Sequence, residues 1–173
     1  IYEQYILGTI FVPGSLTENR KEPLRLSYVF LPGRIIFVDD DGETKKIMSA
    51  LKEKKDLDTE SPGRILGFFL NALMIHDLER LEKMEDQLMK MEDAVLGGAP
   101  EDFNHKMIRY RKQILKLSHY YEQLEHMGET LAANENHMFT KKEVEDFRLL
   151  AQRASRLKGE TQMLHELSLQ VRE

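Results

Sequence analysis

The chain has 173 residues, a net charge of −5 and no cysteine. With 41% hydrophobic and 32% charged residues, it has the composition of an ordinary soluble domain with a real core. The acidic balance argues against a nucleic-acid partner, and the lack of cysteine excludes disulfides, a thiolate metal site and a cysteine nucleophile. No apolar run reaches the roughly 20 residues that cross a bilayer.

The first third of the chain predicts strands and one short helix. Residues 5–12 are rich in β-branched and aromatic side chains, and residues 24–30 alternate apolar and polar positions, so both segments are predicted strands. Residues 35–38 are apolar on both faces, which predicts a strand inside the sheet. Pro32-Gly33 has the wrong twist for the tightest hairpin, so a slightly longer loop is expected there. An amphipathic helix is predicted over residues 43–54.

Three long helices are predicted for the remaining two thirds of the chain. The first begins at the Ser61-Pro62 cap and runs to about residue 96, and the second begins near residue 101 and forms a hairpin with it. The third opens with a capping box at Thr140 and Glu143. Apolar residues recur at alternating spacings of four and three along the second and third helices, as in antiparallel or coiled-coil partners.

The third helix also carries a second apolar set outside its main stripe. Its members are Leu149, Met163, Leu167 and Leu169. One partner helix would leave this set exposed, so more than one neighbour is expected, either within the chain or from another protomer.

These elements define an α+β fold, with a small mixed sheet followed by long antiparallel helices. Residues 1–60 are interpreted as the C-terminal part of a sheet domain whose N-terminal part is missing. Residues 61–133 are predicted to form a long helical hairpin packed on the sheet, and residues 140–173 to form a third long helix. The chain begins at Ile1 and its helical pattern is still running at Val171, so we interpret it as a fragment.

Several residue clusters resemble metal or catalytic sites, but each has a simpler interpretation. His119, Glu122 and His126 share one helical face at ligand-like spacing, opposite the apolar stripe, and a solvated polar face is favoured. A di-iron bundle needs two Glu-x-x-His motifs, and the sequence has none. The most similar segment is Asp102-Phe103-Asn104-His105. Residues 39–43 fail the EF-hand spacing and suggest an Asp-Gly turn. No phosphate loop or nucleophile elbow occurs, so an enzyme is not expected.

Acids gather at the start of the third helix, at Glu143, Glu145 and Asp146. On physical grounds alone, their favoured role is to complement the helix dipole. Glu173 is a lone acid at the end of the chain.

The order of elements, taken with four segments, is similar to that of a known family. These segments are SPGRIL at residues 61–66, LEKME at residues 81–85, RYRKQIL at residues 109–115 and ELSLQVRE at residues 166–173. Over nearly its whole length, the chain resembles the cytoplasmic domain of CorA-type magnesium transporters, and most of all the short CorA-like proteins of Gram-positive bacteria.

The resemblance implies a function at the cytoplasmic face of the cell membrane. Such proteins are homopentamers in which the last helix continues as a stalk into the pore-lining membrane helix. Divalent cations bound by carboxylates between neighbouring domains hold the pore closed, and Mg²⁺ is both the regulatory and the transported ion, with Co²⁺ and Ni²⁺ as alternatives. The gene is then expected to continue into two membrane helices with Gly-Met-Asn between them.

By the same resemblance, the metal-sensing residues are expected to be Glu145, Asp146 and Glu173. An ungapped match from the membrane end places Leu149, which cannot ligate a metal, near the usual sensor aspartate. The alternative function, from a different class, is a soluble coiled-coil adaptor that binds a partner helix along the second apolar set.

Overall fold

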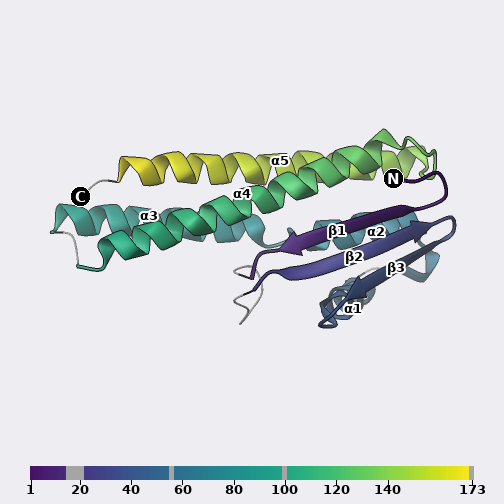
Figure 1. Ribbon diagram of the computed structural model, residues 1–173, viewed down its shortest axis with the longest axis horizontal. Helices are drawn as coiled ribbons and strands as arrows, with labels where there is room; N and C mark the ends of the chain where they lie inside the picture. Colours follow the sequence, from purple (N-terminus) through teal and green to yellow (C-terminus); the bar gives the residue numbers. More distant parts are fainter. Residues whose placement is uncertain (15–21, 55–56, 99–100, 172–173) are drawn as a thin grey trace.

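The computed structural model describes residues 1–14, 22–54, 57–98 and 101–171. Its elements, in chain order, are β1 (Ile6–Val12), β2 (Leu24–Leu31), β3 (Arg34–Asp39), α1 (Glu43–Lys54), the 3-10 turn η2 (Leu57–Thr59), α2 (Pro62–Ala72), α3 (Asp77–Leu96), α4 (Phe103–Ala133) and α5 (Lys141–Gln170). The molecule is elongated, with the sheet at one end. The helices α4 and α5 run along the whole length and over the sheet, and α3 lies beside them beyond the sheet (Figure 1). The α+β fold class is confirmed.

The described strands form one antiparallel sheet in the order β1-β2-β3, where a mixed sheet was expected. The alternation predicted for β2 is confirmed, because Leu24, Leu26, Tyr28 and Phe30 are all buried. The inner face of the sheet lies against the helices, with Phe30 4.8 Å from the Phe139 ring between centroids. The helices therefore cover one face of the sheet (Figure 1).

β3 lies at the edge of the described sheet, so the prediction of an inner strand was wrong. Ile36 and Val38 point outward and are 47% and 54% exposed, while Phe37 packs inward on Phe69 of α2. Apolar residues on both faces of a strand predict that the strand is buried, but they do not specify which strands it pairs with.

The link between β2 and β3 has two residues, not the longer loop expected. Leu31 pairs with Arg34, and Gly33 has a φ of +75°. Proline followed by a residue of positive φ is the pattern of a type II turn, which glycine adopts without strain.

The helical stripes predicted from the sequence form the core. On α4, the nine stripe positions from Phe103 to Leu131 are buried. The stripe that begins at Phe147 on α5 is also buried, as is its last member, Val171, just beyond the end of the helix. Gly128 lets the two helices approach closely, because a Cβ there would lie 2.9 Å from the backbone nitrogen of Ala151. Among the described residues, no helix is long and apolar enough to cross a membrane.

The single helix predicted over residues 62–96 is two helices, α2 and α3, joined by a break at residues 73–76. The hydroxyl of Tyr120 donates to the carbonyl of Leu73 at 3.1 Å, and the guanidinium of Arg153 donates to the carbonyl of Met74 at 3.1 Å. These donors come from α4 and α5, and residues 73–76 contain neither proline nor glycine. The break is therefore stabilised by tertiary contacts that the local sequence does not show.

Candidate functional site

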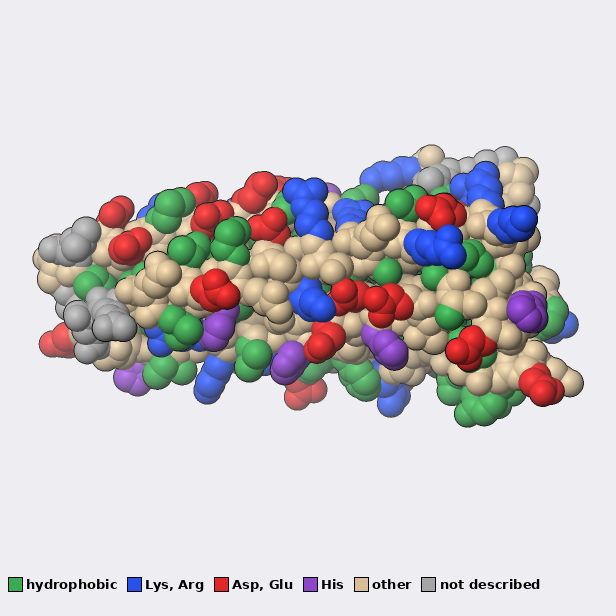
Figure 2. All heavy atoms as spheres, turned by 90° about the horizontal axis from the view of Figure 1, so that it is seen from above, with side chains coloured by type: hydrophobic (Ala, Val, Ile, Leu, Met, Phe, Trp, Pro, Cys, Tyr) green, Lys and Arg blue, Asp and Glu red, His purple; other side chains and the backbone are tan. Residues whose placement is uncertain are grey.

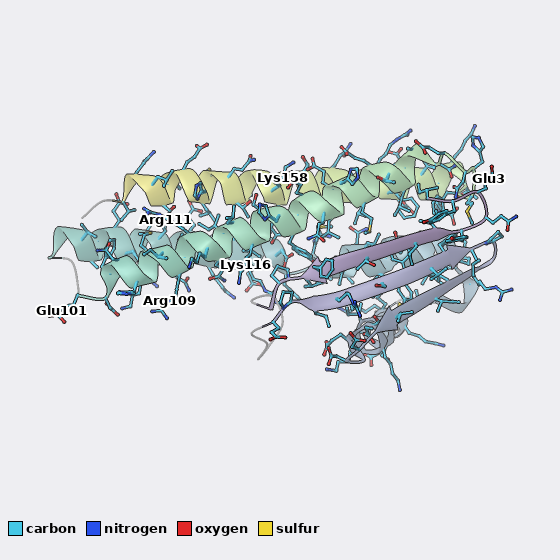
Figure 3. All side chains as sticks on the ribbon, in the orientation of Figure 1. Glu3, Glu101, Arg109, Arg111, Lys116 and Lys158 are labelled. Carbon is cyan, nitrogen blue, oxygen red and sulfur yellow. The ribbon has the colours of Figure 1, made fainter. Side chains whose placement is uncertain are left out.

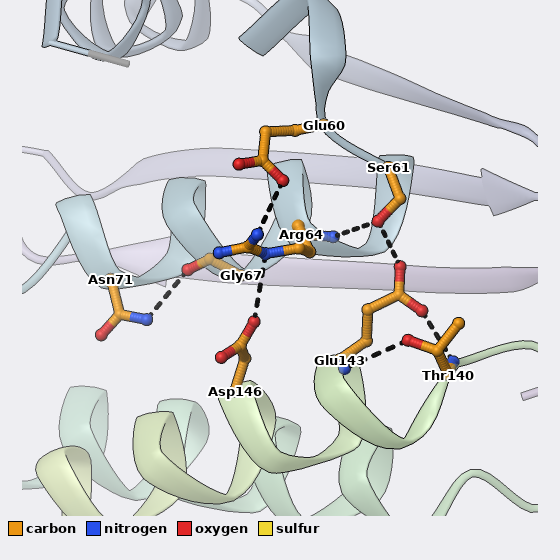
Figure 4. A network of polar contacts seen from close by, with 8 residues as sticks. All are labelled: Glu60, Ser61, Arg64, Gly67, Asn71, Thr140, Glu143 and Asp146. Carbon is orange, nitrogen blue, oxygen red and sulfur yellow. Dashed lines mark hydrogen bonds and ion pairs between the residues drawn. The ribbon is translucent and has the colours of Figure 1, made fainter. Parts of the chain in front are cut away.

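The N-termini of α2 and α5 meet at the side chain of Glu143 (Figure 4). The predicted capping box is confirmed: Thr140 Oγ1 accepts from the Glu143 N–H at 3.3 Å, and Glu143 Oε2 accepts from the Thr140 N–H at 2.7 Å. The Ser61 hydroxyl, which also caps α2, donates to Glu143 Oε1 at 2.6 Å. One carboxylate therefore joins two helix ends.

The environment of Glu143 favours its ionised form. Burial acts to raise its pKa, but the hydrogen bonds from Ser61 and Thr140 and the charge of Arg64 outweigh burial and hold the pKa below its ordinary value of 4.5. Gly63 makes room for this carboxylate, because a Cβ at that position would lie 2.3 Å from Glu143 Oε1.

Asp146, one of the predicted metal ligands, faces α2 (Figure 4). Its Oδ2 lies 3.5 Å from Nε of Arg64, whose guanidinium also pairs with Glu60 at 2.9 Å and lies 5.1 Å from the centroid of the Phe68 ring. The Asp146 side chain is 32% exposed, but the two atoms in contact, Asp146 Oδ2 and Arg64 Nε, are buried. Arg64 was missed from the sequence, although its i,i+4 spacing from Glu60 is a recognisable ion-pair signal.

Glu145, the second predicted ligand, pairs with Arg148 one turn later at 3.2 Å and is 58% exposed. Its carboxylate and that of Asp146 therefore have different cationic partners. Glu173, the third predicted ligand, lies outside the described residues. Within the part of the chain that the structure describes, no group of three acidic or histidine side chains converges on one point.

Two of the alternative clusters lie at a turn and on the surface of α4. Asp39 accepts hydrogen bonds from the backbone N–H groups of Gly42 and Thr44, so it belongs to the turn before α1, as interpreted. His119, Glu122 and His126 line a shallow surface hollow and, within the described residues, do not form a metal-binding group.

One buried acid was not singled out from the sequence. Asp77, the first residue of α3, is 1% exposed and lies 3.4 Å from Arg80. Burial raises the pKa of Asp77 to about 6, against the opposing charge of Arg80. The buried hydroxyl of Tyr121 lies near the Asp77 carboxylate and also opposes the rise in its pKa, although the contact is looser than an ordinary hydrogen bond.

The fold and this site define a class of protein: a small sheet carried on long helices, with acids near the start of the final helix. The family model described as CorA-like Mg²⁺ transporter protein matches residues 2–173, so the chain belongs to this family. No curated protein sequence matches the chain.

Solved structures with the same fold have low sequence identity to the chain. The complete CorA magnesium transporter from Methanocaldococcus jannaschii is 17% identical with a TM-score of 0.81, covering 97% of this chain and 54% of that one. The soluble domain of the same transporter is 17% identical with a TM-score of 0.80, and the match covers 99% of this chain and 69% of that one. The ZntB cytoplasmic domain from Vibrio parahaemolyticus is 13% identical with a TM-score of 0.74, and the match covers 96% of this chain and 66% of that one. The chain thus spans about half of the complete transporter.

Proposed function

We propose that this chain is the cytosolic regulatory part of a CorA-like divalent-cation transporter, which senses Mg²⁺ at contacts between protomers and gates the pore. The observation that carries the proposal is the family match over residues 2–173. The protein acts as a homopentamer at the cytoplasmic face of the membrane, anchored through helices beyond this chain. Mg²⁺ is the regulatory and transported ion, with Co²⁺ and Ni²⁺ as alternatives, and no reaction is catalysed.

The exposed start of α5 supports a metal site that a second protomer completes. Glu145 and Asp146 provide two carboxylates, and no third ligand joins them among the described residues. Mg²⁺ prefers oxygen ligands and keeps several waters. The Glu145–Arg148 ion pair is solvent-exposed and of small stability, so a dication and a neighbouring carboxylate can displace Arg148. The Arg64–Asp146 pair is partly buried, so Asp146 would have to turn away from Arg64 to join the site.

The second apolar set favours contact between the surface of α5 and a neighbouring protomer. Leu149 is 54% exposed and lies one turn after Glu145 and Asp146, so it shares their side of the helix. Met163 and Leu169 are also exposed, at 45% and 51%, whereas Leu167 packs against the core. A neighbouring protomer that covers Leu149 would bring its own side chains close to the two acids.

Sedimentation velocity tests the proposal on the 173-residue chain. We expect millimolar MgCl₂, but not NaCl at equal ionic strength, to shift the chain to a larger species. The variant Glu145→Ala with Asp146→Ala should abolish this shift. The matched control is Glu92→Ala with Asp93→Ala, because these residues form the same exposed dipeptide on α3.

Three outcomes would count against this assignment. A profile unchanged by Mg²⁺ would remove Glu145 and Asp146 as sensor residues. Equal loss in both double variants would show general charge screening. Capture of a helical partner along Leu149, Met163 and Leu169, without any response to Mg²⁺, would favour the coiled-coil adaptor, which the exposure of these residues also fits.

A further inference from the structure

A groove of about 510 Å³ lies between α4 and the residues at the end of β1 and the start of β2. On the strand side it is lined by Phe11, Pro13 and Pro23, and on the α4 side by cationic and amide side chains. Small-molecule sites in proteins have volumes of roughly 300–1,000 Å³ and combine apolar walls with a few polar groups. The groove therefore has the size and character of a ligand site, and it shares only His119 with the clusters described above.

The charge of α4 is strongly divided along its length. Residues 103–121 contain five lysines and arginines and no acid, whereas residues 122–133 contain three glutamates and no lysine or arginine. The groove lies along the basic half, in a chain whose net charge is −5. This local positive charge favours an anionic ligand.

Three of the five cationic side chains, Arg109, Lys112 and Lys116, line the groove, and their spacings of three and four place them on one face of α4. In Figure 3, Lys116 lies where α4 passes the end of β1. The other two are occupied: Lys106 pairs with Asp102, and Arg111 donates to the Ser168 carbonyl.

No acid neutralises the cations of the groove within the described residues. Lys112 and Lys116 make no ion pair or hydrogen bond there, and the Arg109 side chain donates only to the His105 carbonyl of its own helix, at 3.4 Å. Like charges one turn apart repel each other, so an anion between them would stabilise this face.

The opposite side of the groove presents an exposed aromatic ring. Phe11 is 51% exposed, and its N–H donates to Gln123 Oε1 at 3.3 Å, which ties the end of β1 to α4. An exposed aromatic residue on the wall of a groove that also carries a row of cations suits a ligand that has both a planar ring and phosphates. Flat lipid surfaces and nucleic-acid duplexes do not fit a groove of this volume.

We propose that this groove binds a nucleoside di- or triphosphate, with Arg109, Lys112 and Lys116 on the phosphates and Phe11 against the base. The proposal is independent of the metal-sensing function, because it uses none of the residues at the start of α5. A nucleotide bound here would give the chain a second small-molecule input besides Mg²⁺.

Isothermal titration calorimetry of the 173-residue chain tests the proposal with ATP, ADP, tripolyphosphate and adenosine at constant ionic strength. We expect ATP and ADP to bind, tripolyphosphate to bind more weakly and adenosine not to bind. Lys112→Gln with Lys116→Gln should weaken ATP binding by about tenfold or more, since two charge-assisted contacts are lost. Phe11→Ser should weaken ATP binding severalfold and leave tripolyphosphate binding unchanged.

The matched control is Lys45→Gln with Lys90→Gln, which removes two exposed lysines outside the groove. It should leave ATP binding within about twofold of the natural chain. Equal loss in both lysine variants would show nonspecific charge attraction and overturn the proposal, as would no ATP binding at millimolar concentration. Binding to phosphatidylglycerol vesicles through Lys112 and Lys116, without ATP binding, would replace the nucleotide by a lipid phosphate.

Discussion

Glu143 connects two helix ends through one carboxylate, which accepts from Ser61 ahead of α2 and from Thr140 ahead of α5. The Thr140–Glu143 half of this arrangement could be predicted, because a capping box is a local pattern of fixed spacing. The Ser61 contact could not, because it joins residues 82 positions apart that meet only when the helices pack. The ion pair between Arg64 and Asp146 was not predicted for the same reason.

Replacing the shared carboxylate should weaken both helix starts. We expect Glu143→Ala to lower the free energy of unfolding by about 1–3 kcal/mol, because Ser61 and Thr140 lose a buried acceptor. Urea denaturation followed by circular dichroism measures the loss. The control Glu145→Ala, at an exposed position, should change stability by less than about 0.5 kcal/mol. Similar losses in the two variants would contradict the role given to Glu143.

Because its pKa is raised, Asp77 should make the stability of the folded chain change with pH in the direction opposite to that expected for an acid in an ion pair. Its folded pKa of about 6 lies above the ordinary value of 3.8, so the folded chain binds the proton more tightly than the unfolded chain. Stability should therefore rise as pH falls from 6 toward 4, by about 1 kcal/mol per pH unit from this group. Above pH 6 the cost of the buried charge is constant.

Comparison with Asp77→Asn isolates this effect, because other titrating groups cancel in the difference. The stability of the natural chain minus that of the variant, measured by urea denaturation at pH 7 and pH 4.5, should be larger at pH 4.5. Parallel changes in the two proteins would show that Asp77 has an ordinary pKa.

The helices and strands differ in how far the sequence could predict them. The stripes of α4 and α5 were predicted because each helix buries one face against the other, and burial follows the helical period directly. The break between α2 and α3 was not predicted, because it depends on hydrogen bonds from Tyr120 and Arg153, which are distant in the sequence. The edge position of β3 was not predicted either, because it depends on which strands pair in the folded chain. Local propensity carries no signal for such contacts.

Gly128 tests the close packing of α4 on α5. Alanine there would place its Cβ within 3.0 Å of the Phe147 carbonyl and against Ala151, so we expect a loss of about 1–3 kcal/mol in the free energy of unfolding. Gly159→Ala is the matched control, because nothing lies within 4 Å of a Cβ there. It should stabilise the chain by about 0.5–1 kcal/mol through helix propensity. Thermal denaturation distinguishes the two, and stabilisation by both would mean that α4 and α5 are further apart.

At the scale of the whole molecule, α5 spans from Glu143 beside the sheet to the far end of the helices, where the described chain ends (Figure 1). Acidic, basic and hydrophobic side chains are interspersed over the face seen from above (Figure 2). The family could be recognised from the order of elements, because that order is a property of the sequence. The sensor residues remain a prediction, because the proposed site would be shared between protomers and so would have no complete pattern in one chain.

Magnesium flux through the full-length gene product in proteoliposomes tests the proposed gating most directly. Millimolar Mg²⁺ on the face that carries this domain should inhibit flux in the natural protein and in the Glu92→Ala, Asp93→Ala control. The Glu145→Ala, Asp146→Ala variant should keep conducting at the same Mg²⁺ concentration, because it lacks the carboxylates that we propose bind the closing ion. Equal inhibition of all three proteins, or no Mg²⁺ flux in any of them, would contradict the proposal.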